Sequence, residues 1–409
     1  MTAKIQGNLK DVTLSFEQAR ECVLREVGRP TSTDGASTEQ VPLADCAGRV
    51  LAESVVSDRD YPPFPRSARD GYAVRAADLP GSLRIIGEVR AGQVSEKTVG
   101  SGEAIEIMTG APLPDGADAV VMIEHTERDG DRVQIARDLQ SGDNFNPRGA
   151  EARKGAVILP AGHRVGFAEI GLLAMVGRQC VPAYRLPRVA ILPTGDELVD
   201  VGTEPQEFQI RDTNSWSLAA QVQRAGGLPE RLPIARDNYE STRDLIERGL
   251  SADLLLLSGG VSAGKYDIVE RVLADLGARF FFDRVLIQPG QPLVFGTVRD
   301  KFFFGLPGNP ASTMVTFELF VRAAIERLSG AAEAPLPFLR AAITRDFRHK
   351  TGLTRFLPAR LSEDGANVTP ESWHGSGDIP ALARANAFLV MDANRETWKA
   401  GDDIRVLFK

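Results

Sequence analysis

The chain has few of the residues that build disulfide frameworks and zinc sites. It holds three cysteines in 409 residues, Cys22, Cys46 and Cys180, and no two of them have the C-x-x-C spacing. This odd, scattered set indicates neither disulfides nor zinc, and a reducing compartment is the simplest interpretation. The four histidines lie far apart in the sequence, so histidine chemistry has little support.

Long apolar runs and an excess of positive charge are also missing. No run approaches the ~18 apolar residues that span a bilayer, and the N-terminal segment has no apolar core of a secretion signal. Lys and Arg number 48 against 55 Asp and Glu, a net charge of −7. A chain this acidic does not bind nucleic acid or anionic membrane through its overall field. We expect a cytoplasmic protein with no nucleic-acid or membrane partner, in which local charges hold any anionic ligand.

Capping, periodicity and composition divide the first half of the chain. Ser15 to Gln18 form a capping box, and the apolar residues behind it (Ala19, Cys22, Val23, Val27) share one helical face. Residues 31–40 are rich in Ser, Thr and Gly and indicate a surface loop, and the Pro-rich residues 61–65 break regular structure. From residue 71 to about 140, short apolar runs alternate with Gly, Pro and Asp turns, which predicts a small β-rich unit. Residues 166–176 return to a helical pattern.

Residues 188–330 alternate apolar strands with longer helical patterns, which is typical of a βαβ arrangement around a parallel sheet. We expect strands at 189–192, 229–234, 254–257 and 280–286, and a further strand at 302–305. A helix is expected from Pro310 to Leu328, with Asn309 as its N-cap. Residues 334–337 indicate a linker to a last unit with β-like runs at 387–391 and 403–408.

Polar and glycine-rich loops follow four of these strands. In an open parallel sheet such loops meet beyond the carboxyl ends of the strands, where ligands bind. Residues 258–262 (Ser-Gly-Gly-Val-Ser), with Lys265, are suited to a phosphate. Four acids lie in the same loops: Asp196, Glu197, Asp237 and Asp267. They would repel an anion, so a bridging Mg²⁺ is the economical interpretation; tight turns and helix caps are the alternative. The loop is not a Walker A motif, because Tyr266 stands where that motif has Ser or Thr.

Two loops of the β-rich unit are also polar and glycine-rich, residues 66–72 and 108–112, and Arg148, Arg153 and Lys154 form a basic cluster. Each alone is typical of a solvated loop. Together they are candidates for a second wall around an anionic ligand.

In order and spacing, these segments resemble the molybdopterin molybdenumtransferase family, which includes MoeA and the E domain of gephyrin. The resemblance covers nearly the whole chain. The matching segments are residues 67–73, 107–112, 193–198, 212–214, 258–262 with Asp267, 305–310 and 375–376.

The resemblance implies a multidomain α/β plus β fold in an elongated homodimer. Its units would be an N-terminal, helical/β linker domain (1–55 plus 150–187), a β-rich inserted lid domain (56–149), a central parallel-sheet α/β domain that binds molybdopterin (188–330) and a C-terminal β domain (336–409). The active site would lie between the α/β domain of one subunit and the β-rich domain of the other.

Family members take adenylylated molybdopterin and molybdate, cleave the phosphoanhydride with Mg²⁺, insert the metal into the dithiolene and release AMP. A molybdopterin adenylyltransferase and apo-molybdoenzymes are the implied partners. By matching position, the catalytic residues would be Asp267, Asp237, Glu197, Asp70 and Thr109, and the first three would also bind the metal. Asp70, Thr109 and Glu151 would come from the partner subunit. The substrate-binding set would be Thr194, Gly195, Asp196, Ser258, Gly259, Gly260, Ser262, Lys265, Pro307, Gly308, Asn309, Arg148, Glu151, Gln288, Gln291 and Ser376.

Two segments depart from the family pattern. The family often has Lys-Pro-Gly-Lys-Pro where this chain has Gln288-Pro-Gly-Gln-Pro292. Neutral amides in place of two cations should weaken binding of a dianion, because charge-assisted hydrogen bonds are the stronger ones. Compensation by Arg284, Arg211 or Lys265 is one hypothesis. A turn that usually ends Gly-Glu-Asp is here Arg148-Gly-Ala-Glu151, with one carboxylate fewer.

Three functions are compatible with these residues. The leading hypothesis is the metal-inserting transferase, favoured by Asp237, Asp267 and Glu197. The second is a scaffold or paralogue that binds pterin without efficient turnover. A hydrolase of other pyrophosphates is the third, and it would not need the β-rich insert. The choice between molybdate and tungstate, and the recipient apo-enzyme, are open at this stage.

Overall fold

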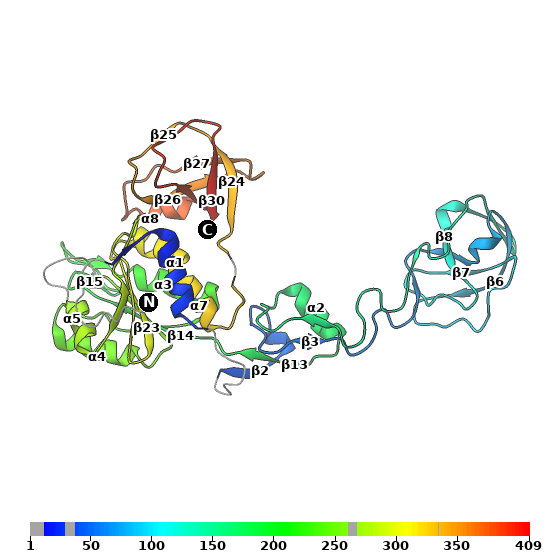
Figure 1. Ribbon diagram of the computed structural model, residues 1–409, viewed down its shortest axis with the longest axis horizontal. Coiled ribbons are helices and arrows are strands. Elements are labelled where there is room, and N and C mark those ends of the chain that lie inside the picture. Colours follow the sequence, from blue (N-terminus) through cyan, green and yellow to red (C-terminus); the bar gives the residue numbers. More distant parts are fainter. Residues whose placement is uncertain (1–11, 29–36, 261–267, 334) are drawn as a thin grey trace, which may run out of the picture.

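The computed structural model describes residues 12–28, 37–260, 268–333 and 335–409. The chain is elongated (Figure 1): the α/β unit and the C-terminal β unit share one end, the β-rich unit lies at the other, and a narrow linker unit joins them. This is the multidomain α/β plus β fold that the sequence predicts. In the described ranges, no helix is long and apolar enough to cross a membrane.

The α/β unit is built on a six-stranded sheet of order β17-β14-β18-β23-β22-β19. Its strands are β14 (Arg188–Pro193), β17 (Leu228–Arg231), β18 (Leu254–Ser258), β19 (Arg279–Phe282), β22 (Val294–Val298) and β23 (Lys301–Leu306). The first three and β23 run parallel, so the four predicted loops do leave one edge of the sheet.

At the lateral side of the sheet formed by β22 and β19, the strands are antiparallel, because β22 pairs with both β19 and β23 in that sense. The strand predicted at 280–286 is divided into β19 and β20 (Arg284–Val285), and β22 was not anticipated. The β22–β23 hairpin turns at Arg299 and Asp300, both at positive φ (48° and 63°). Such turns are usually marked by Asn-Gly or Asp-Gly, so the sequence carries no signal for this one.

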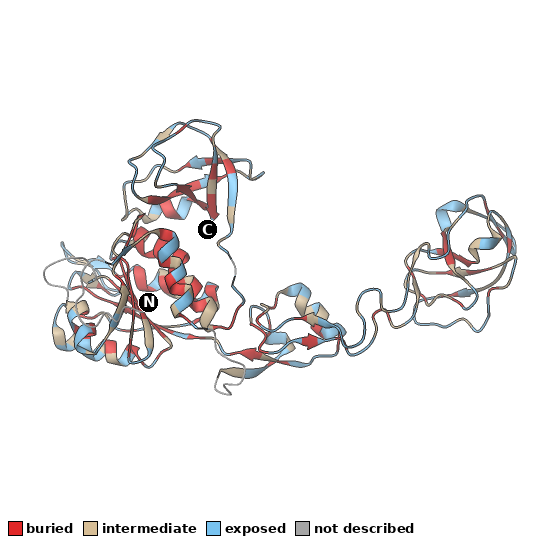
Figure 2. Cartoon of the chain, in the orientation of Figure 1, coloured by how far each residue is buried: buried red, intermediate tan, exposed pale blue. Residues whose placement is uncertain are grey.

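Helices cover both faces of the sheet, as buried parallel strands require. They are α3 (Asn214–Ala225), α4 (Tyr239–Gly249), α5 (Ile268–Asp275), α6 (Pro310–Thr316) and α7 (Arg322–Leu328), with a π-helical turn, Phe317–Val321, between the last two. Side chains alternate along β18: Leu254 and Leu256 enter one core, and Leu255 and Leu257 enter the other. Figure 2 shows the resulting concentration of buried residues in this unit.

The first helix, α1 (Phe16–Glu26), begins with the predicted capping box of Ser15 and Gln18. Its residues Ala19, Cys22 and Val23 are buried in the core that contains α3 and α7. The range 1–55 was expected to belong to the linker unit, and for α1 this assignment needs correction, because its apolar face packs on the α/β unit. The remaining boundaries stay predictions.

The C-terminal unit is a closed ring of strands. Its strands are β24 (Phe338–Ile343), β26 (Thr354–Leu361), β27 (Asn367–Pro370), β28 (Ala387–Met391) and β30 (Asp403–Phe408). The ring closes because β26 pairs with β28 as well as β27. A short strand from the preceding unit, β21 (Ile287–Gln288), adds in parallel to β26, so the two units share a ladder.

The linker unit contains two antiparallel strand pairs and one helix. They are β2 (Thr38–Pro42) with β13 (Cys180–Tyr184), β3 (Val55–Val56) with β12 (Val157–Leu159), and α2 (Phe167–Met175). The loop predicted at residues 31–40 is therefore wrong from Thr38 onward, and residues 31–36 lie outside the described ranges.

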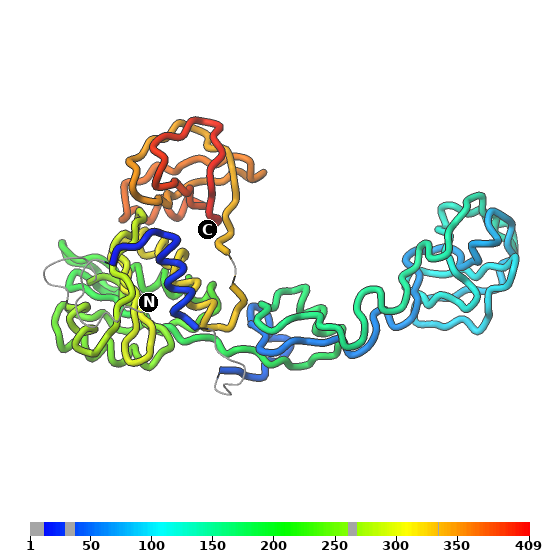
Figure 3. Tube along the Cα trace, in the orientation of Figure 1, coloured from blue at the N-terminus to red at the C-terminus, as the bar shows by residue number. Residues whose placement is uncertain are grey.

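The β-rich unit is a six-stranded sheet inserted between the two halves of the linker unit, as the outgoing and returning chain in Figure 3 shows. Its strands, in sheet order, are β8 (Ala119–Met122), β5 (Gly71–Val74), β7 (Glu103–Ile107), β6 (Gly81–Val89), β10 (Arg132–Ile135) and β9 (Thr126–Asp129).

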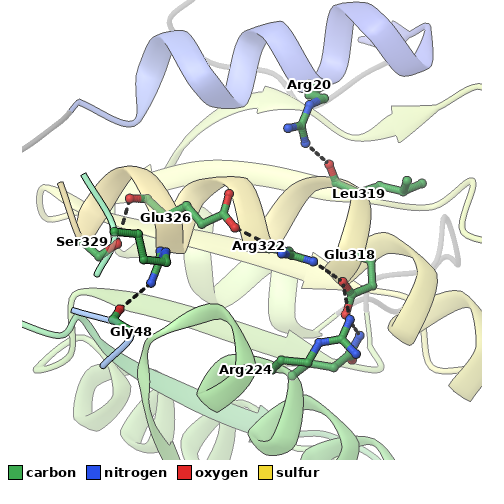
Figure 4. A network of polar contacts seen from close by, with 10 residues as sticks. Arg20, Gly48, Arg224, Glu318, Leu319, Arg322, Glu326 and Ser329 are labelled. Carbon is green, nitrogen blue, oxygen red and sulfur yellow. Dashed lines mark hydrogen bonds and ion pairs between the residues drawn. The ribbon is translucent and has the colours of Figure 1, made fainter. Parts of the chain in front are cut away.

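A polar network ties α3 to the π-helical turn and α7 (Figure 4). Glu318, 8% exposed, accepts from Gln221 Nε2 at 2.8 Å and pairs with Arg224 at 3.2 Å and Arg322 at 3.3 Å. Arg322 also pairs with Glu326 at 3.0 Å. One buried carboxylate thus ties α3 to the helical run 310–328, and the N-terminal ends of both adjoin the loops at the sheet edge.

Replacing Glu318 by Ala should lower the free energy of unfolding by about 2 kcal/mol, because the amide and two guanidinium groups lose their shared acceptor. Urea denaturation followed by circular dichroism measures it. The matched control is Glu396→Ala, which breaks the exposed pair with Arg348 and should change the free energy by less than about 1 kcal/mol. Equal effects of the two changes would contradict a structural role for the buried network.

Candidate functional site

The loops after β14, β17 and β18 are hydrogen-bonded to one another at the edge of the sheet. The N–H of Thr194 donates to the Ser258 carbonyl at 3.0 Å, and the N–H of Gly195 donates to the Ala235 carbonyl at 3.1 Å. Three predicted substrate loops are therefore a single connected surface.

Three carboxylates lie on this surface. The N–H of Asp237 donates to Asp196 Oδ1 at 3.1 Å, and the N–H of Asp196 approaches Asp237 Oδ2 at 3.4 Å. Glu197 folds back over Gly195, since a Cβ there would lie 2.4 Å from Glu197 Oε2. All three acids are exposed. Oxygen ligands on an open rim fit Mg²⁺, which binds through one or two carboxylates, waters and substrate phosphates.

Asp267, the third predicted metal ligand, lies outside the described residues, as do Ser262 and Lys265. Within the described ranges, no group of three or more His, Cys, Asp or Glu side chains is placed to hold a metal ion. The predicted ligand set thus remains a hypothesis, of which the structure describes Asp237 and Glu197.

The turn after β18 requires glycine at two successive positions. Gly259 and Gly260 have φ of +91° and +65°, and a Cβ on Gly259 would lie 2.7 Å from the Thr194 carbonyl oxygen. A Cβ on Gly260 would lie 2.8 Å from Thr194 Oγ1. That hydroxyl is buried with no hydrogen-bond partner. The turn therefore keeps its backbone and one unpaired hydroxyl together, as a phosphate cradle needs.

Asn214, which the sequence motif 212–214 contained without a role, connects two of the loops. Its Nδ2 donates to Ser258 Oγ at 2.9 Å and to the Gly308 carbonyl at 2.8 Å, and its Oδ1 is buried with no partner. Asp212 accepts from the Ser215 N–H at 3.0 Å and fixes the start of α3. The signal available in the sequence was the place of Asn214 in the matching segment 212–214; its partners follow from the fold.

The loop after β23 carries Pro307, Gly308 and Asn309 into α6, where Asn309 is the N-cap without a side-chain hydrogen bond. The Thr313 hydroxyl donates to the carbonyls of Pro307 and Asn309. From the C-terminal unit, the Ser376 carbonyl accepts from the Ala311 N–H at 2.9 Å. Ser376 therefore lies beside the start of α6, and its role in substrate binding stays a prediction.

A second set of predicted residues lies in the β-rich unit and at its junction, far from this rim within one chain (Figure 1). The Thr109 N–H donates to Asp70 Oδ1 at 2.6 Å, and this hydrogen bond lowers the pKa of Asp70. Glu151 pairs with Arg66 at 2.5 Å. Arg148 pairs instead with Asp60 at 2.8 Å. One chain does not bring Asp70, Thr109, Arg148 and Glu151 to the carboxylates.

Replacing Asn214 by Ala should speed amide hydrogen exchange at the rim, because Ser258 Oγ and the Gly308 carbonyl lose their common donor. The reporter is Gly259, whose N–H donates to Leu306 at 3.3 Å. Mass spectrometry of peptides covering 254–260 and 304–310 measures the exchange. Asn367→Ala, at an exposed position, is the control. Unchanged exchange in Asn214→Ala would mean that the loops hold their positions without this bridge.

Comparison with known proteins matches the chain to three family models along its length. They are the MoeA N-terminal region (domain I and II) at residues 14–177, the probable molybdopterin binding domain at 190–327, and the MoeA C-terminal region (domain IV) at 340–409.

Relatives that match nearly the whole chain point to the same family. The chain is 36% identical over 384 residues to the molybdopterin molybdenumtransferase of Bacillus subtilis, covering 90% of this chain and 89% of the relative. It is 31% identical over 398 residues to that of Staphylococcus aureus strain COL, covering 95% and 94%. A crystal structure of a molybdopterin biosynthesis MoeA protein from Pyrococcus horikoshii matches at 32% identity and a TM-score of 0.73, covering 97% of this chain and 99% of that one. The chain belongs to the MoeA family.

Proposed function

We propose that this protein is a molybdopterin molybdenumtransferase, which takes adenylylated molybdopterin and molybdate, inserts the metal into the dithiolene and releases AMP. The observation that carries the proposal is the joined rim: exposed carboxylates of Asp196, Glu197 and Asp237 beside the Gly259–Gly260 turn. A phosphoanhydride needs both parts, because the turn accepts its phosphate and the acids hold a cation against it. The relatives from Bacillus subtilis and Staphylococcus aureus are named molybdopterin molybdenumtransferases.

Mg²⁺ is the cation that these oxygen ligands suit, and Asp237, Glu197 and Asp267 are its proposed ligands. When bound, it supplies charge that stabilises the phosphoanhydride as it breaks. Residues of the chain itself bind and position the substrate. Thr194, Ser258 and the two glycines, Gly259 and Gly260, hold its phosphate end, and Asn309 and Ser376 border the opposite side of the site. No nucleophilic side chain is required.

The homodimer is part of the proposal. Asp70 and Thr109 would reach the rim from the β-rich lid domain of the partner subunit, and Glu151 from the junction of that domain with the linker domain, which accounts for their distance from the rim within one chain (Figure 1). We place the protein in the cytoplasm, where a molybdopterin adenylyltransferase would supply the substrate and apo-molybdoenzymes would receive the product. Its three cysteines are free thiols, which suits a reducing compartment.

Asp237→Asn should reduce AMP release at least a hundredfold, because the isosteric amide keeps the shape and removes the charge that holds the cation. AMP is measured by chromatography after incubation with adenylylated molybdopterin, Mg²⁺ and molybdate, and pterin binding by fluorescence titration should change little. Asp244→Asn is the control: it removes the same charge from an exposed position on α4. Normal turnover in Asp237→Asn would remove Asp237 from the metal site.

Mixing two inactive variants tests the shared site. Asp70→Asn and Asp237→Asn dimers, unfolded together and refolded at equal amounts, should regain about a quarter of wild-type AMP release, because half of the dimers are mixed and each of those has one intact site. Each variant refolded alone is the control. If both residues serve a site within one chain, the mixture stays inactive.

A further inference from the structure

A bidentate ion pair joins the linker unit to the α/β unit. Arg185, directly after β13, donates from Nη1 and Nη2 to the two carboxylate oxygens of Asp253, both at 2.7 Å. Asp253 directly precedes β18, is 17% exposed at its side chain, and also accepts from the Arg188 N–H at 2.8 Å. A bidentate pair with a largely buried carboxylate has a defined geometry, unlike most surface ion pairs. Asp253 therefore holds the chain at the point where it passes from one unit into the other.

The apolar contact between these two units is small. Tyr184 packs its ring on Gly330, where a Cβ would lie 2.2 Å from the ring. Among the described residues, the buried cluster around Tyr184 adds only Val50, Ala52 and Ala331. Domains move relative to one another unless their interface is large and apolar. The angle between the units therefore depends on the ion pair as well as on packing.

This joint, formed by the Arg185–Asp253 pair and the Tyr184 cluster, lies away from the rim. Asp253 precedes the first residue of β18, whereas Ser258 of the rim ends that strand. Arg164 of the linker unit packs at the C-terminal end of α3, since a Cβ on Gly226 would lie 2.9 Å from Arg164 Nη1. Asn214 begins the same helix at the rim. The joint is thus at the opposite edge of the sheet, and a change in it leaves the rim contacts in place.

We propose that Arg185 and Asp253 are positioning residues that act across the homodimer: their ion pair sets the angle at which the lid domain of one subunit meets the rim of the other. The inference rests on the proposed function, in which Asp70 and Thr109 of the lid domain complete the partner's site. The lid domain lies at the far end of the linker unit (Figure 1), and its displacement grows with its distance from the joint. A misplacement of about 1 Å can cost about a hundredfold in rate.

The refolded mixture of Asp237→Asn and Asp70→Asn chains tests the joint, because the working site takes its lid domain from the first chain and its rim from the second. Arg185→Ala is introduced into either chain. The matched control is Arg188→Ala, which removes the same charge from a neighbouring position. It breaks a pair with Glu230 at 2.9 Å within the α/β unit and keeps the N–H that Asp253 accepts.

In the chain that supplies the lid domain, Arg185→Ala should lower AMP release by the mixture about tenfold or more. In the chain that supplies the rim it should leave release unchanged, and Arg188→Ala should change release in neither chain. Equal losses from the two placements of Arg185→Ala would indicate a role in folding alone and overturn the inference. A loss confined to the rim-supplying chain, or no loss in either, would also overturn it.

Small-angle X-ray scattering of the whole dimer separates this inference from the proposed function. A loosened joint should broaden the distribution of interatomic distances in Arg185→Ala, whereas Arg188→Ala should keep the wild-type distribution. A wild type that releases no AMP rejects the transferase, and scattering then decides on the joint by itself. An Arg185→Ala profile identical to that of the wild type overturns the joint whatever the activity.

Discussion

The amide of Asn214 is the contact on which the site depends. Four parallel strands bring their following loops to one edge, but parallel pairing alone fixes only the strands. Asn214 joins Ser258 to Gly308, and the packed Glu318 network holds the helix that carries it against α7. These contacts hold α3 and α7 in fixed positions, and the glycine turn and the carboxylates therefore keep their relative positions.

Because the molecule is elongated, the residues proposed for the site lie at opposite ends of one chain (Figure 1). The rim carries the acids and the glycine turn, whereas Asp70 and Thr109 lie in the β-rich unit at the far end of the molecule (Figure 1). A site assembled from two subunits excludes water only when the lid of one covers the rim of the other, which suits cleavage of a phosphoanhydride.

Much of the fold was readable from the sequence because local signals agree with the tertiary structure. The capping box at Ser15 and the apolar run 254–257 gave α1 and β18. The signals failed where packing decides: β22 has no turn marker, and α1 packs on a unit distant in sequence. The same limit applies to the site. Loops could be assigned to one edge, but Asn214 gains its role from contacts across the fold, which periodicity does not encode.

The central claim is that this rim catalyses metal insertion and does not only bind pterin. The most direct measurement is AMP release by the purified wild-type protein from adenylylated molybdopterin and Mg²⁺, with and without molybdate. Release that depends on molybdate and yields cofactor able to activate a molybdenum-free apo-enzyme is the predicted result. Tight pterin binding with no AMP release, with or without molybdate, would contradict the account and identify the chain as a pterin-binding scaffold.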